Sequence, residues 1–255
     1  MPPSLPSLLL LLLLLLTLLP TPHASSSSPS PLDSFKVHGY RWHSLSLLRD
    51  LRRLEALASQ EGVSQKSLEK AADYVAKFNQ GTLVDIEETM FFPWIDERCS
   101  PTAEEKASLL SLRASKRSIS SKSLSLPALS KSPSPSPALR SLCADLAEET
   151  RKVLVAQDTL VVPIVVRDVS EKEQTKFNNL VLRKLGLLNS RVHLVGMRDA
   201  VWESGSSLER RLFEADIPRV ARSMIPRWRA GLYKERVGEL EGIVVDVRDA
   251  VGEEG

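Results

Sequence analysis

The sequence predicts an all-helical (all-α) protein. Aromatic residues make up only 5% of the 255 residues, and glycine is scarce at eleven. Leu, Ala, Glu, Lys and Arg are common instead, which is a composition that suits helices. Apolar residues recur at steps of three and four, a spacing that places them on one face of a helix. No sustained alternation of Val, Ile and Thr, the pattern typical of strands, is present.

The chain begins with an apolar leader. Residues 8–19 form a run of twelve with a single threonine. This length fits the core of a secretory signal and falls short of the roughly 20 residues that a membrane span needs. We therefore expect a signal peptide at 1–24, a Ser/Pro-rich spacer at 25–34, and a protein of the secretory pathway or the extracellular space. An uncleaved anchor and an organelle-targeting leader are the alternatives.

Two helices are predicted next. The first runs from about Phe35 to Ser59, and its Arg49, Arg52, Arg53 and Glu55 are expected to face water. The opposite face carries the apolar stripe Trp42, Leu45, Leu48, Leu51, Leu54 and Leu57. The second helix opens at the capping residue Ser64 and continues, loosened at Gly81, to Ile95.

Ser100 and Pro101 start a third helix, with proline at its tolerated first position. From 111 to 137 the sequence is rich in Ser, Lys and Pro, and we expect a low-complexity, flexible surface insertion, because repeated proline cannot continue a helix. A fourth long helix starts near Ala138. Ser170 and Glu173 form a capping box that opens the next helix, and Gly186 ends it.

Residues 186–242 predict a helical extension, and residues 243–255 a tail with little to bury. Basic and aromatic residues alternate on helical spacing between 219 and 236, so this helix either touches an acidic surface or docks with its arginines reaching water. The net charge of +2 gives no general attraction to nucleic acid. We expect a protein partner of unknown identity, with membrane contact only through the leader or this basic helix.

The two cysteines, Cys99 and Cys143, allow one disulfide in an oxidising compartment or two buried thiols. Both alternatives remain open at the level of the sequence. Their spacing does not form a zinc motif.

Two stretches of the chain match each other. Residues 87–94 recur in outline as residues 157–164, seventy positions later. Each stretch has a carboxylate followed five residues later by a proline: Glu88 with Pro93, and Asp158 with Pro163. Each is then followed by a helix-start serine. Long helices that repeat the same ending predict an antiparallel bundle made of two similar helical hairpins.

His43, residues 85–94 and residues 158–174 together resemble the hemerythrin-like (HHE cation-binding) family. The resemblance covers most of a domain that we place at 35–185. It implies an up-down four-helix bundle in which histidines and carboxylates, four residues apart on each helix, point inward at a di-iron centre that binds dioxygen. Residues 191–197 and 225–228 resemble a helical C-terminal extension carried by a subset of that family.

The sequence departs from the family's ligand pattern. The positions four before Glu88 and Asp158, where the family has histidine, are Val84 and Leu154. The third helix carries no histidine either. The candidate remnant of the metal site is His43, Glu87, Glu88 and Asp158, about half of what a di-iron centre uses. If Glu88 and Asp158 are buried without a cation, one of them should have a raised pKa or an Arg or Lys partner.

We therefore predict a hemerythrin-like protein whose di-iron site is degenerate and which acts as a helical structural or interaction module, with no resident cofactor. The alternative is binding of a metal ion (non-haem iron) or dioxygen through the reduced site. His193 lies among apolar residues and is interpreted as part of the core or its rim. We predict no enzymatic activity, because no Ser/His/Asp order, Cys/His nucleophile or Gly-rich phosphate loop is present.

Overall fold

A computed structural model describes residues 31–132 and 137–250. Within these ranges every regular element is a helix and none is a strand, so the predicted all-helical class is confirmed. The predicted signal peptide and most of the spacer lie outside the described residues. In the described part of the chain, no helix combines the length and the apolar character needed to cross a bilayer.

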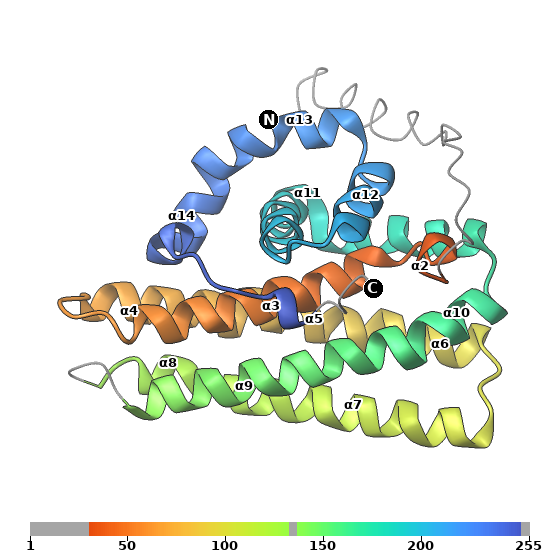
Figure 1. The fold of residues 1–255 in the computed structure, drawn as a ribbon, viewed down its shortest axis with the longest axis horizontal. Helices are drawn as coiled ribbons and strands as arrows, with labels where there is room; N and C mark the ends of the chain where they lie inside the picture. The colour runs from red at the N-terminus through yellow and green to blue at the C-terminus, as the bar shows by residue number, and fades with distance from the viewer. Residues whose placement is uncertain (1–30, 133–136, 251–255) are drawn as a thin grey trace, which may run out of the picture.

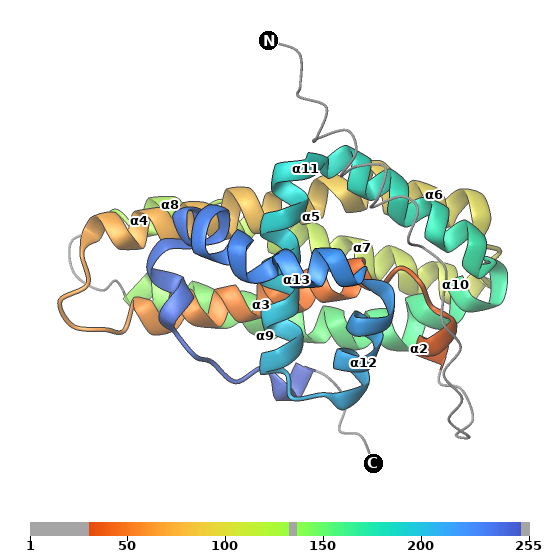
Figure 2. The same cartoon turned by 90° about the horizontal axis from the view of Figure 1, so that it is seen from above.

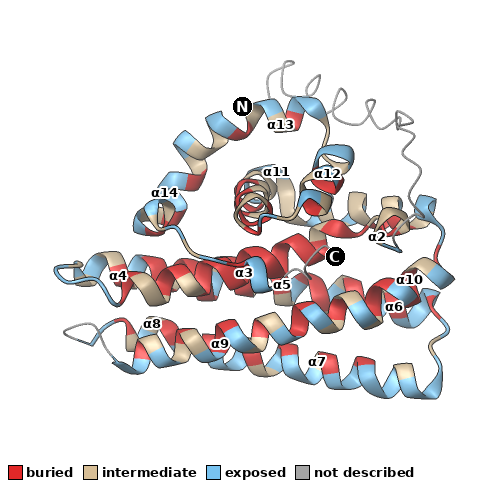
Figure 3. Ribbon diagram, in the orientation of Figure 1, coloured by how far each residue is buried: buried red, intermediate tan, exposed pale blue. Residues whose placement is uncertain are grey.

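The helix α3 (His38–Leu57) lies at the centre of the fold (Figure 1). It contacts α9 (Pro137–Ala156) on one side and α11 (Glu171–Glu203) on another. Almost all of its residues are therefore buried, as Figure 3 shows, including polar ones that a surface helix would expose. Leu45, Leu48, Leu51 and Leu54 supply its apolar stripe, as the sequence predicts.

A continuous rod, residues 65–98, returns beside α3 in the opposite direction (Figure 1). It consists of α4 (Gln65–Asp73), the π-helical turn η1 (Tyr74–Gln80), α5 (Gly81–Ile86), a second π turn η2 (Glu87–Phe91) and α6 (Phe92–Arg98). The Ser64 hydroxyl accepts a hydrogen bond from the Ser67 amide and so caps its start, as predicted.

The helix α7 (Ala103–Ser123) contacts both the rod 65–98 and α9. It begins with a capping box between Thr102 and Glu105. The prediction of a flexible insertion from 111 to 137 is wrong for most of that range, because α7 continues to Ser123 and a short helix, α8 (Leu126–Leu129), follows. Although α7 is rich in serine, a few of its residues are buried and pack it against its neighbours. They are Leu109, Leu112, Lys116, Ile119 and Ser123.

The repeat seen in the sequence is also present in the structure. The helix α9 runs into a π turn, η3 (Gln157–Val161), and then into α10 (Val162–Asp168), with the same register as η2 and α6. Pro93 and Pro163 are each the second residue of the α-helix that follows the π turn. Proline has no amide hydrogen and its ring crowds the preceding turn, so a wider turn at this point lets the helix continue.

The helix α11 turns sharply at Gly186, whose backbone φ of 69° favours glycine. The sequence predicts a helix end here. The second half of α11 crosses α3, and the chain then forms an arch over α3, seen in Figures 1 and 2. The arch consists of α12 (Ser207–Asp216), α13 (Arg219–Trp228), η4 (Arg229–Tyr233), α14 (Lys234–Val237) and η5 (Gly238–Gly242). Beyond it Val247 is fully buried, and Ile243 and Val245 pack against the core, so residues 243–249 of the predicted tail do bury apolar side chains.

Candidate functional site

The four predicted site residues lie on α3 (His43), at the start of η2 (Glu87 and Glu88) and in η3 (Asp158). Each of the three carboxylates forms an ion pair with a different basic side chain. Within residues 31–132 and 137–250, no group of three or more His, Cys, Asp or Glu side chains is placed to hold a metal ion.

Glu87 points into the interior and forms an ion pair with Lys116 of α7. The side chains are 2% and 5% exposed, so this pair is almost completely removed from water. Burial raises the pKa of the Glu87 carboxyl, although the Lys116 ammonium opposes that change. Burial also lowers the pKa of Lys116, with Glu87 opposing it. For both groups the effect of burial on the pKa is larger than the opposing effect of the partner's charge.

Both polar and apolar side chains surround this pair. The Tyr40 ring lies 4.7 Å from Lys116 Nζ, at a distance suited to a cation–π contact. Gln157, the uncharged counterpart of Glu87 in the repeat, donates a 3.2 Å hydrogen bond to Ser44 Oγ. Ser44, Gln80, Glu87, Lys116 and Thr150 contribute to the lining of a cavity of about 10 Å³, close to the smallest volume that holds one water molecule.

Glu88 lies on the outside of the same rod. Arg117 donates two hydrogen bonds to its carboxylate, at 2.9 and 2.8 Å, in the forked geometry that favours arginine. These bonds lower the pKa of Glu88. Glu87 and Glu88 therefore face different surroundings, one in the core and the other at the surface.

Asp158 is bound by Arg41 of α3, whose Nη2 donates a 2.8 Å hydrogen bond to Oδ2. Arg41 is buried and also pairs with Glu209 of α12, which accepts a 2.6 Å hydrogen bond from the Trp42 indole. Arg41 thus joins the π turn η3, the central helix and the arch. Glu88 and Asp158, for which the sequence predicts a raised pKa or a basic partner if they are buried, are only partly buried, and each is paired with an arginine.

His43 contacts His193 of α11, with the two ring centroids 4.5 Å apart. The His193 ring also stacks on Phe78 at 4.5 Å. Burial lowers the pKa of His43 to about 4 and that of His193 well below its ordinary value. Both imidazoles are therefore neutral at pH 7, and neither buried Nε2 atom has a hydrogen-bond partner among the described residues. The prediction that His193 belongs to the core is confirmed.

Sequence reasoning missed a buried cluster around Arg49 and Asp50. Arg49 is fully buried, and its expected exposure to water is wrong, as it is for Arg53. Arg49 donates 2.8 Å hydrogen bonds to Asp50 Oδ1, to the Gly196 carbonyl and to the Tyr233 hydroxyl. The arch covers this face of α3. The burial of Arg49 therefore depends on how the C-terminal extension packs, and no local pattern around Arg49 predicts it.

Both cysteines are buried and free, which decides between the two alternatives left by the sequence. Burial raises the pKa of the Cys99 thiol to about 11 and that of Cys143 to about 12. These thiols are therefore protonated and unreactive near neutral pH.

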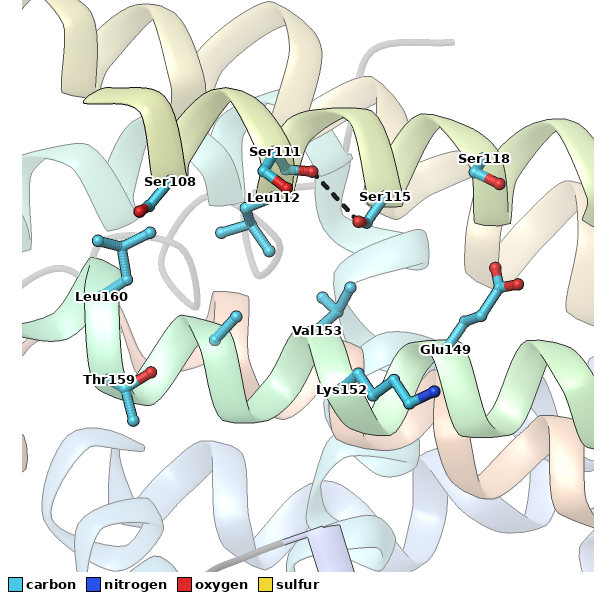
Figure 4. A pocket seen from close by; sticks show the side chains of 11 residues that line it. Ser108, Ser111, Leu112, Ser115, Ser118, Glu149, Lys152, Val153, Thr159 and Leu160 are labelled. Carbon is cyan, nitrogen blue, oxygen red and sulfur yellow. Dashed lines mark hydrogen bonds between the residues drawn. The ribbon is translucent and has the colours of Figure 1, made fainter. Parts of the chain in front are cut away.

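An open groove of about 650 Å³ lies between α7 and α9 (Figure 4). Four serines of α7 form one wall, and Ser115 Oγ donates a 3.1 Å hydrogen bond to the Ser111 carbonyl. The lining is Ser108, Ser111, Leu112, Ser115, Ser118, Glu149, Lys152, Val153, Ala156, Thr159 and Leu160. It contains neither histidine nor cysteine, so the groove offers hydroxyls and apolar side chains rather than a nucleophile with its base.

No family model, curated protein or solved structure matches this chain.

Proposed function

We propose that this protein is a structural or interaction module built on an up-down four-helix bundle of the hemerythrin-like kind. In this proposal α3, the rod 65–98, α7 and the α9–α10 segment are its four helices, and the metal position at its centre is degenerate. Support comes from their mutual contacts, from the alternating directions seen in Figure 1 and from the duplicated π turns.

The observation that carries the proposal is the Lys116 ammonium on Glu87 in the interior. A carboxylate at the centre of a helical bundle needs a compensating positive charge, and here a side chain of the protein supplies it. A cation entering beside Lys116 would meet a like charge; at about 4 Å and an effective dielectric constant of about 20 this costs about 4 kcal/mol per unit charge. The same position therefore favours Lys116 over a metal ion.

The other candidate ligands support the same interpretation. Glu88 and Asp158 each form an ion pair with a different arginine, on α7 and on α3, respectively. His43 packs against a second imidazole and not against a carboxylate of the predicted set. Binding of iron or dioxygen through a reduced site is the alternative that the experiment below addresses.

Elemental analysis of the purified protein, before and after anaerobic loading with ferrous iron, tests the proposal. We expect iron well below one atom per chain and no charge-transfer band in the visible spectrum. Stoichiometric iron with such a band would refute the proposal and favour the reduced metal site.

Two variants isolate the contribution of the ammonium. Lys116→Gln removes the buried charge and leaves the Glu87 carboxylate available, so we expect metal uptake to become measurable. Arg117→Gln removes a neighbouring charge from the surface pair with Glu88 and should leave uptake unchanged. Equal behaviour of the two variants would contradict the role assigned to Lys116.

A further inference from the structure

Among the residues that the structure describes, the corner of α11 at Gly186 carries the largest group of exposed leucines on one helix. Four of the exposed large apolar side chains lie within residues 180–188: Leu180, Leu182, Leu187 and Leu188. We call this segment, from Lys176 to Arg191, the α11 corner. In Figure 2 it projects at the upper edge of the molecule. Several adjacent exposed leucines mark a contact surface more often than isolated ones do.

The base of the corner is fixed to the rest of the fold. Phe177 is buried and stacks on Trp94 of α6, with centroids 4.5 Å apart. Lys184 Nζ lies 2.9 Å from the Asp85 carboxylate and 2.6 Å from Thr89 Oγ1. The two anchors lie seven residues apart on α11 and hold it to the rod 65–98. Leu180, Leu182, Leu187 and Leu188 are each between 48% and 59% exposed. Their exposure is therefore a property of an ordered corner.

The charge of the corner is positive. Residues 174–198 contain five basic residues and no acidic residue. Lys184 is paired with Asp85, and Arg191 and Arg198 lie over tryptophan rings. Lys176 and Arg183 are exposed, and neither forms an ion pair within the described residues. The surface thus combines apolar side chains with unpaired positive charge.

We propose that the α11 corner binds the surface of an anionic lipid bilayer. The leucines enter the boundary between headgroups and acyl chains, while Lys176 and Arg183 lie at the level of the lipid phosphates. Apolar side chains next to basic ones are the combination by which helices bind at such an interface. A bilayer also accommodates a convex corner, whereas a protein partner would need a matching hollow.

This inference extends the proposed function, since it names the partner of an interaction module. The two are tested separately, because iron analysis reports on the bundle interior and lipid binding reports on the corner. A metal-free protein that does not bind lipid would contradict only the lipid proposal. A protein that binds iron and also binds lipid would contradict only the proposed function.

The test uses the full chain with Leu188→Cys labelled by a polarity-sensitive fluorophore. Native Cys99 and Cys143 are buried, so the label reacts at the new thiol. With vesicles of phosphatidylcholine and phosphatidylserine we expect a blue shift and a several-fold rise in emission. The matched control is Leu110→Cys on α7, because Leu110 is 58% exposed and Leu188 59%. Its emission should not change, even if the apolar leader brings the protein to the vesicle.

A second pair of measurements addresses charge and fold. Arg183→Gln in the labelled protein should weaken the response and its dependence on salt, with an unchanged circular dichroism spectrum. An unchanged emission at position 188 would overturn the proposal, as would an equal response to vesicles of phosphatidylcholine alone. A blue shift that grows with protein concentration in the absence of lipid would also overturn it and assign the corner to self-association.

Discussion

Lys116 of α7 and Glu87 of η2 form an ion pair in the interior of the protein, with both side chains almost fully excluded from water. Glu87 and Lys116 are 29 residues apart, and their ion pair joins the rod 65–98 to α7, the next long helix of the chain. Its energy depends on the presence of both members, because either charge alone would remain buried without compensation.

We therefore expect Lys116→Met to lower the free energy of unfolding by about 3–5 kcal/mol. Urea denaturation followed by circular dichroism measures the change. The double variant Glu87→Leu/Lys116→Met should recover most of the loss, since no charge is then left in the core. The surface variant Arg117→Met should have little effect. A double variant as unstable as Lys116→Met alone would show that the uncompensated Glu87 carboxylate is not the cause of the loss.

His43 gives the protein a dependence on pH with a defined sign. Because burial lowers its pKa to about 4, the unfolded chain binds a proton between about pH 6.5 and 4 that the folded chain does not. Its contribution to stability is complete above pH 6.5 and is lost as the pH falls through this window. When the pH falls from 7 to 5, the free energy of unfolding should decrease in both proteins. The decrease should be roughly 2 kcal/mol smaller in His43→Gln than in the wild type.

Urea denaturation of both proteins at several pH values provides that comparison. The difference between the two curves cancels the contributions of other groups, among them Asp216, whose pKa burial raises to about 6. Parallel curves for wild type and His43→Gln would mean that His43 titrates normally in the folded protein.

The crossing of α11 over α3 depends on Gly196. A Cβ at this position would lie 2.9 Å from Ser46 Oγ, which is closer than such atoms approach. Gly196→Ala should therefore destabilise the protein by about 1–3 kcal/mol and speed amide exchange in residues 187–203. Adding Ser46→Ala should restore most of the stability, because it removes the clashing oxygen.

Gly39→Ala is the matched control for that crossing, since no atom lies within 4 Å of the added Cβ. It should be neutral or slightly stabilising, as alanine is favoured over glycine inside a helix. If Gly196→Ala were equally neutral, the two helices would have room to separate, contrary to the close crossing described.

The two buried thiols should resist modification. Under native conditions at pH 7, Cys99 and Cys143 should react with a disulfide reagent far more slowly than in urea. In the unfolded protein, two thiols per chain should react with the reagent. Absorbance of the released thiolate measures both rates. Fewer than two reactive thiols after unfolding without reductant would point to a disulfide in the purified protein.

Local signals in the sequence predict much of the fold. The paired carboxylate–proline stretches indicate the repeat, and the structure contains a π turn before each of Pro93 and Pro163. Caps at Ser64 and Ser170 and the turn at Gly186 are likewise encoded by the residues at those points. Features of this kind depend on a few neighbours in the chain, so a single sequence contains them.

Features that depend on distant packing are not predictable in this way. The stretch 111–123 has the composition of a linker, yet it forms a helix because a few of its residues fit against α9 and the rod. Arg49 looks like a surface residue until the arch covers it. Lys116 resembles any basic residue of a serine-rich segment, and only its position opposite Glu87 assigns it to the site.

The π turns have a consequence for the rotation of the helices. An α-helix advances by about 100° per residue, so a turn that contains one additional residue changes by that angle which side chains face inward. The buried positions are Glu87 and Gln157, whereas the neighbouring Glu88 and Asp158 lie nearer the surface. Deleting one residue from η2 would therefore rotate the preceding helix by about a quarter turn and bring different side chains to the interior.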